Sequence, residues 1–220
     1  MKYLFSFALS VVLLQVYGQT NDLTSFYPYK NEIGINVTNV LGNLLSLNPN
    51  NAKSPYGITY RRHLGKTSFR SGYNVNITNS SEEDFSNGNF ITRKLNILTI
   101  DTRFGLEKHL LLSKKFLFSY GFDVLFGYVK ENSEINEFNF GSSTFISNQN
   151  TLGVGLGPVL RFEYKISDRL FISTESSFYG YYSKTTETLN INGNVSNEPE
   201  KSSSNLKLEL PQSLFFNISF

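Results

Sequence analysis

The stretch LELPQSLFFNISF, residues 208–220, alternates large apolar side chains with polar or small ones as far as Phe220. A period of two is the pattern of a β-strand with one apolar and one polar face. Chain termini usually fray unless a sheet or a packed helix holds them. The pattern therefore predicts a terminal strand that is part of a sheet.

The same alternation recurs along most of the chain. It predicts eight strands, at residues 32–46, 55–63, 67–78, 92–108, 115–131, 149–166, 169–187 and 205–220. The first is ambiguous beyond Val37, because NVLGNLL is equally compatible with a short helical turn. Several of these strands reach the ~9–11 residues that a tilted transmembrane strand needs.

The connections between the predicted strands alternate in length. Tight turns are expected at 64–66, around 112–114 and at 167–169, and the other connections are long and polar. Short turns at one rim, long loops at the other and an even strand number are typical of an outer-membrane barrel. The predicted fold class is all-β: an eight-stranded antiparallel up-and-down transmembrane β-barrel.

Alternation does not by itself say which face points inward. The apolar face is mostly Leu, Ile, Phe and Tyr, whereas the other face holds Gly, Ser, Asn, Thr and charges of both signs. An eight-stranded barrel has an interior just wide enough to be filled by side chains or to hold one small ligand. Small residues and paired charges suit that lumen, and the bulky set suits lipid. The alternative is a secreted soluble barrel whose apolar interior binds a lipophilic ligand.

The first residues, MKYLFSFALSVVLLQVYGQT, combine Lys2 with an apolar core and a small residue at Gly18. This is the pattern of a secretory signal peptide, and the core is too short for a spanning helix. The expected organisation is a cleaved signal peptide at 1–18, a periplasmic N-terminal arm at 19–31 and the barrel domain at 32–220. The expected location is the cell outer membrane.

Composition excludes several kinds of site. The chain has 220 residues, a formal charge of +2, no Cys and 2 His. It therefore has no thiolate site and no basic cluster for nucleic acid, and an all-histidine metal site is excluded. We expect no cofactor, no metal and no catalytic residue.

The polar face carries a set of charges that we expect to fill the lumen as a paired network: Arg61, Arg70, Asp101, Arg103, Glu107, Asp123, Arg161, Glu163 and Glu175. Counting across the tight turns places Arg161 opposite about Glu175 and Arg103 opposite about Asp123. Arg61 and Arg70 fall opposite each other and would repel unless Glu107 or Glu32 lies between them. A selective pore is the alternative, but eight strands leave no aqueous channel.

An outer-membrane lipid-modifying enzyme is the sharper alternative function. That chemistry would need a Ser or His beside a carboxylate at the outer-leaflet rim. His63 and His109 instead lie near the short-turn rim. We therefore expect a protein that is not an enzyme.

With these strands placed, the sequence resembles the small outer-membrane β-barrel family of Gram-negative bacteria, the PorT-like and OmpA/OmpX-type single-domain barrels. The resemblance rests on NEIGINVTNVLGNLL, YGITYRRHLGKTSFRSGYN, GVGLGPVLRFEY and LFFNISF. Pro158 and Pro211 depart from ideal strands and are expected to form bulges.

The resemblance implies that the outward residues of the last strand are read by the outer-membrane assembly machinery: Leu214, Phe216, Ile218 and Phe220. The expected partners are thus outer-membrane lipid, that machinery during biogenesis, and an extracellular or envelope protein that contacts the loops. The expected function is structural, adhesive or accessory, with secretion as one possibility.

Overall fold

A computed structural model of the chain describes residues 26–38, 57–86, 89–138 and 142–220. Its strands are β1 Asn31–Asn36, β2 Ile58–His63, β3 Thr67–Ser86, β4 Asn89–Leu111, β5 Phe116–Phe138, β6 Ser142–Lys165, β7 Leu170–Ile191, β8 Asn194–Asn197 and β9 Lys201–Ser219. In the described part of the chain, no helix is long and apolar enough to cross a membrane.

The strands close into an antiparallel ring. Each of β1 to β7 pairs with its neighbours in sequence, and β9 pairs with both β7 and β1. The short β8 pairs with the far end of β7 in line with β9, so β8 and β9 together take one place in the ring. The eight-stranded up-and-down antiparallel barrel is therefore confirmed.

Both ends of the barrel domain meet at the short-turn rim. Ile33 of β1 pairs with Ile218 of β9, and Phe220 donates its backbone N–H to the carbonyl of Asn31 at 2.9 Å. The β2–β3 turn is closed by a bond from the Leu64 N–H to the Thr67 carbonyl at 2.7 Å. Gly65 in that turn has φ +78°, a conformation that glycine adopts without steric cost.

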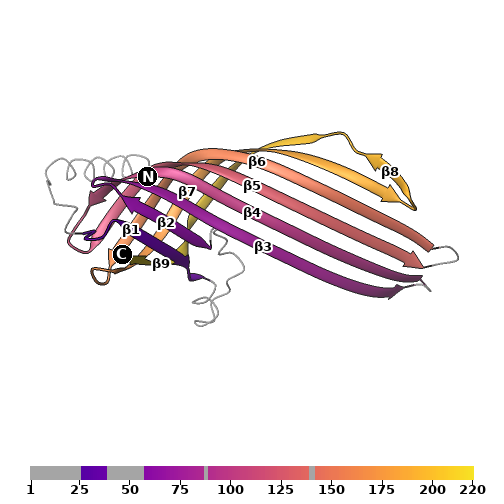
Figure 1. Ribbon diagram of the computed structural model, residues 1–220, viewed down its shortest axis with the longest axis horizontal. Helices are drawn as coiled ribbons and strands as arrows, with labels where there is room; N and C mark the ends of the chain where they lie inside the picture. Colours follow the sequence, from indigo (N-terminus) through magenta and orange to yellow (C-terminus); the bar gives the residue numbers. More distant parts are fainter. Residues whose placement is uncertain (1–25, 39–56, 87–88, 139–141) are drawn as a thin grey trace, which may run out of the picture.

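Strands β3 to β6 are each six to eight residues longer than the sequence pattern indicates, and β7 is three residues longer. Strands β3 to β7 have between 20 and 24 residues. Figure 1 shows them continuing well past the ends of β1 and β2 as a curved sheet. The long polar loops expected at 79–89 and 132–149 are therefore mostly hairpin strand. Beyond the part of the barrel whose outer face is apolar, both faces of the sheet can carry polar residues. The strand pairing therefore continues where the two-residue apolar pattern stops.

The first strand is shorter than expected. β1 ends at Asn36, whose side chain accepts a bond from the Thr38 N–H at 3.0 Å. Val37 and Thr38 still bond to Leu214 of β9, at 2.9 Å and 2.7 Å. The rest of the expected first strand, 39–46, lies outside the described residues. The second expected strand begins at Ile58 rather than 55.

The two strand prolines behave differently. Near Pro211 the pairing shifts from Glu175↔Ser213 to Ser177↔Glu209, so β9 has two extra residues there. The bulge expected at Pro211 is confirmed. The bulge expected at Pro158 is wrong, because Leu156↔Gly180 and Val159↔Ser177 keep one register and Phe122↔Pro158 is a regular pair.

The barrel is apolar outside and charged inside. Among the described residues, side chains such as Leu106, Leu152 and Leu156 are 63%, 65% and 57% exposed on its outer face. Arg61 and Arg70 are 0% and 1% exposed in its interior. This polarity is the reverse of that of a soluble barrel, and it contradicts the alternative of an apolar, ligand-binding interior.

Candidate functional site: a charged lumen with an aromatic plug

Charged side chains from seven strands meet in the lumen. We call them the lumen cluster: Glu32 of β1, Arg61 of β2, Arg70 of β3, Arg103 and Glu107 of β4, Asp123 of β5, Arg161 and Glu163 of β6, and Glu175 of β7. They point inward because successive residues of a strand face opposite sides, and each of these charges lies on the side opposite the apolar residues. None is more than 8% exposed.

Glu175 binds three arginines. Its Oε1 lies 2.6 Å from Arg61 Nη2, and its Oε2 lies 2.6 Å from Arg70 Nη2 and 2.8 Å from Arg103 Nη1. Charge-assisted bonds of this kind are the strong ones in proteins. One carboxylate of β7 thus links β2, β3 and β4 across the lumen.

Glu107 and Glu32 complete a second layer. Glu107 lies 3.3 Å from Arg61 Nε, 3.2 Å from Arg70 Nη1 and 3.6 Å from Arg161 Nη1. Glu32 Oε1 lies 3.1 Å from Arg61 Nη1 and 2.7 Å from Arg161 Nη2. These contacts bring β1 and β6, which are not neighbours in the ring, into the same network.

Asp123 lies at the end of the lumen cluster that is farther from the short turns. It lies 3.3 Å from Arg70 Nε and 3.8 Å from Arg103 Nη1, and it accepts a bond from the Tyr179 hydroxyl at 2.8 Å. Tyr179 is 1% exposed and packs on Leu125. Sequence reasoning missed Tyr179. It lies four residues after Glu175 in β7 and therefore on the same inward face, so the two-residue alternation could have identified it.

The pairing makes the buried charges tolerable. Each of the four arginines contacts at least two of the five carboxylates of the cluster. Removing charges from water costs several kcal/mol per ion, and good geometry with further hydrogen bonds offsets that cost. A lumen held in this way is a packed core.

Two of the three expected cross-strand relationships are found. Arg161 pairs with Glu175, and Arg61 pairs with Arg70. The third is wrong by two residues, because Arg103 pairs with Leu125. The reason is the length of the β4–β5 turn. The last pair is Leu111↔Leu117, so residues 112–116 make the connection, whereas the expected turn was 112–114.

Asp101 lies apart from the lumen cluster. It lies beside Gly127 and Tyr181. If Gly127 carried a Cβ atom, that atom would be 3.3 Å from Asp101 Oδ1. Tyr181 also crosses Gly153 and Gly155, where a Cβ at Gly155 would meet the ring at 2.8 Å. Gly153 and Gly155 of the GVGLG stretch thus make room for one large lumen side chain.

An aromatic plug closes the short-turn end of the lumen. Phe26 and Tyr27, which we call the plug, are 2% and 7% exposed and pack with Leu117 and Phe171. The Tyr27 hydroxyl donates to Glu163 Oε1 at 2.5 Å. Residues 26 and 27 of the expected N-terminal arm therefore lie inside the barrel, and residues 19–25 of that arm lie outside the described residues. Sequence reasoning missed this, although two aromatics just before the first strand were a usable signal.

Both histidines lie beneath the plug. The His63 ring stacks on Tyr27 with centroids 3.7 Å apart, and His63 Nε2 lies 3.4 Å from Glu32 Oε2. His109 lies between Ser68 and Ser119, with Nδ1 2.8 Å from the Ser119 hydroxyl oxygen. They are 6% and 2% exposed, so they are part of the packed lumen.

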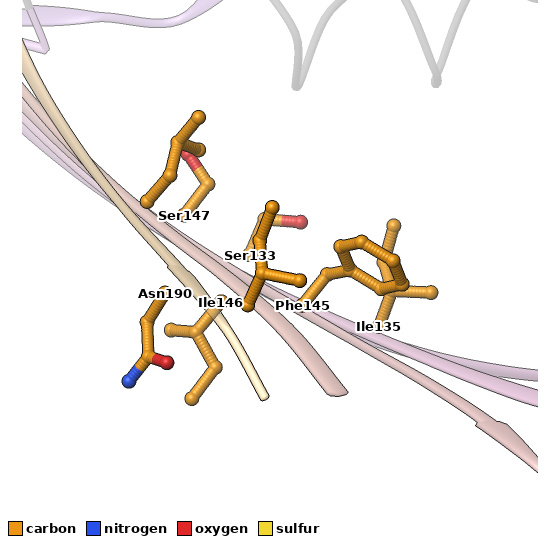
Figure 2. A pocket seen from close by; sticks show the side chains of 8 residues that line it. Ser133, Ile135, Phe145, Ile146, Ser147 and Asn190 are labelled. Carbon is orange, nitrogen blue, oxygen red and sulfur yellow. The ribbon is translucent and has the colours of Figure 1, made fainter. Parts of the chain in front are cut away.

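The extended sheet carries a shallow apolar hollow far from the lumen cluster. It has a volume of about 130 Å³ and lies between the ends of β5, β6 and β7. Figure 2 shows its labelled side chains, including Ile135 and Phe145. Ile135, Phe145 and Ile191 are directly paired across the three strands, and Ser133 and Ser147 flank them.

The last strand presents alternate residues to the outside. Ile218 and Phe220 are 44% and 54% exposed, whereas Phe215 and Asn217 are fully buried. Leu214 and Phe216 are half-buried on the outward side. The residues expected to act as an assembly signal thus share the outer face of β9, which continues to Phe220, the residue that follows the strand.

No protein-family model matches the chain, and no curated protein matches it. Among solved structures, it is similar to a major outer membrane protein from Thermus thermophilus, with 14% identity, a TM-score of 0.44, and coverage of 87% of this chain and 98% of that one. Acinetobacter baumannii CarO is similar with 13% identity, a TM-score of 0.38, and coverage of 87% and 97%. These likenesses are weak, and the fold assignment rests on the closed ring of paired strands itself.

Proposed function

We propose that this chain is an integral outer-membrane β-barrel whose packed lumen conducts no solute and whose function lies in the sheet that projects from the membrane. The observation that carries the proposal is the inverted polarity of the barrel, with exposed leucines outside and fully buried arginines inside. Only a hydrocarbon environment makes that arrangement favourable, and a closed ring leaves no unpaired edge in lipid.

The projecting sheet supports a structural, adhesive or accessory role. Strands of up to 24 residues extend far beyond the ~9–11 needed to cross the bilayer. The apolar hollow around Phe145 lies on this projecting part, where an extracellular or envelope protein partner could contact it. A secretion-related accessory function belongs to the same proposal.

We propose a non-enzymatic role. A lipid-modifying site would need a nucleophile or base exposed to lipid at the outer rim. His63 and His109 are instead enclosed beneath Tyr27 at the opposite end of the barrel.

Export and assembly complete the proposal. Residues 1–18 would be removed as a signal peptide, and the outward residues of β9 would be read by the assembly machinery. N-terminal sequencing of the mature protein should then begin at Gln19.

Membrane fractionation tests the central claim. The protein should be recovered in the outer membrane, and an unboiled sample should migrate differently from a boiled one on a denaturing gel. Recovery as a soluble periplasmic or secreted species would contradict the proposal.

A further inference from the structure

The short-turn end of the barrel carries a ring of cations. We call six exposed side chains the basic rim: Arg62, Lys66, Lys108, Lys114, Lys115 and Arg169. Among the described residues of these turns, one acidic side chain is exposed, that of Asp168. It lies 2.9 Å from Lys165 Nζ. The rim is therefore strongly positive on a chain whose formal charge is +2.

In the part of the chain that the structure describes, the opposite end of the barrel has the opposite charge. Residues 78–94, 130–145 and 184–201 contain nine acidic side chains and five basic ones. The cations are thus concentrated at one end of the barrel axis, and a partner at that end should be anionic.

Two cations of the basic rim lie on the lipid-facing side of the strands. Arg62 pairs directly with Phe69, which is 37% exposed on the outer face. Lys108 follows Leu106 by two residues and shares its outward phase, since Glu107 and His109 point inward. Long cationic side chains at the edge of an apolar surface reach the depth of lipid headgroups.

Tyrosine rings accompany two further cations. Lys115 Nζ lies 6.0 Å from the centre of the Tyr164 ring. The Arg169 guanidinium lies 4.8 Å over the Tyr29 ring and donates from Nε to its hydroxyl at 2.9 Å. Tyrosine beside a cation is the composition of a membrane interface.

We propose that the basic rim binds the headgroups of anionic phospholipids in the leaflet that adjoins the plug end. This inference rests on the proposed membrane location. Continuity of Arg62 and Lys108 with the apolar outer face favours a lipid phosphate over a soluble anion.

Spin-labelled lipids test the inference directly. The protein is refolded into phosphatidylcholine vesicles that contain trace spin-labelled phosphatidylglycerol or phosphatidylcholine, and the motionally restricted fraction of each label is measured. Phosphatidylglycerol should associate about fivefold more strongly, the factor that one cation near an anionic surface contributes. The preference should disappear at high salt, a measurement that needs no variant.

A matched pair of variants locates the binding. The rim variant changes four cations to glutamine: Arg62, Lys108, Lys114 and Lys115. The control variant makes the same change at four cations of the projecting end: Arg93, Lys94, Lys130 and Lys184. The preference should be lost in the rim variant and retained in the control.

The outcomes separate this inference from the proposed function. A barrel that inserts but binds both lipids equally, or that loses its preference only in the control variant, overturns the inference and leaves the membrane location intact. A chain that inserts into no vesicle overturns the proposed function itself.

Discussion

Arg61 and Arg70 face each other directly across the β2–β3 pair, and each binds the same two carboxylates, Glu107 and Glu175. Like charges in directly opposed positions destabilise a sheet. Here the two guanidinium groups are held together by Glu107 of β4, the strand next to β3, and by Glu175 of β7, which reaches them across the lumen. Closure of the ring is therefore what makes this cross-strand pair stable.

Replacing Glu175 with Gln should destabilise the barrel strongly. The change keeps the shape but removes the charge that Arg61, Arg70 and Arg103 share. Breaking a buried ion pair typically costs about 3–5 kcal/mol. Urea titration of the protein refolded in lipid vesicles should show a loss of this size in the free energy of unfolding.

Glu187→Gln is the matched control for that experiment. Glu187 lies 3.2 Å from Lys201 on the projecting part of the sheet, where solvent screens the pair. Little change in stability is expected. Equal stability losses in the two variants would mean that the lumen cluster does not hold the fold.

Neighbouring residues of β6 test which face meets lipid. Leu156 is 57% exposed on the outside, so Leu156→Arg should cost about 2–4 kcal/mol in lipid vesicles, as at other lipid-facing midplane positions. Leu156→Phe should be nearly neutral, because lipid accommodates the larger ring.

Gly155→Phe should be harmful, because a Cβ there already meets Tyr181 at 2.8 Å. Urea titrations of the three variants give the ranking. If Gly155→Phe were tolerated and Leu156→Phe destabilising, the apolar face would point inward and the membrane-barrel interpretation would be wrong.

The plug should protect the histidines from modification. The chain has 2 His, both buried beneath Tyr27. Diethyl pyrocarbonate should therefore react slowly with the folded wild type. The Phe26→Ala/Tyr27→Ala variant should react at both histidines, as counted by mass spectrometry of an untagged protein.

Tyr29→Ala is the control for the plug experiment, since Tyr29 contacts Arg169 at the rim and not the histidines. It should leave both histidines protected. Rapid reaction in the wild type would show that the plug does not stay docked in solution.

Conductance should be low with or without the plug. Behind the plug, Arg103, Asp123 and Glu175 are buried side chains that fill the lumen. Wild type and the Phe26→Ala/Tyr27→Ala variant should both lack large, stable channels in planar bilayers. Such channels from purified monomer would support the pore alternative.

The sequence by itself determined the barrel, because a two-residue period fixes strands and their two faces wherever one face meets apolar surroundings. It also indicated eight of the nine members of the lumen cluster, since Arg61, Glu175 and the others lie in the inward phase. Glu32 was recognised as a bridging candidate for the arginines. The strand ends were missed where that period fades, as at 79–86 and 132–138, because the hydrogen-bonded ladder there continues without regular alternation of apolar and polar residues.

Only the tertiary structure decided which charges touch. The Glu175 carboxylate reaches Arg70 and Arg103, which lie on strands that do not neighbour β7, and no local pattern encodes a contact across a closed ring. The same holds for Tyr27, whose bond to Glu163 spans 136 residues of sequence. Periodicity acts along one strand and between adjacent strands, whereas lumen contacts depend on barrel closure and on how far each side chain reaches across it.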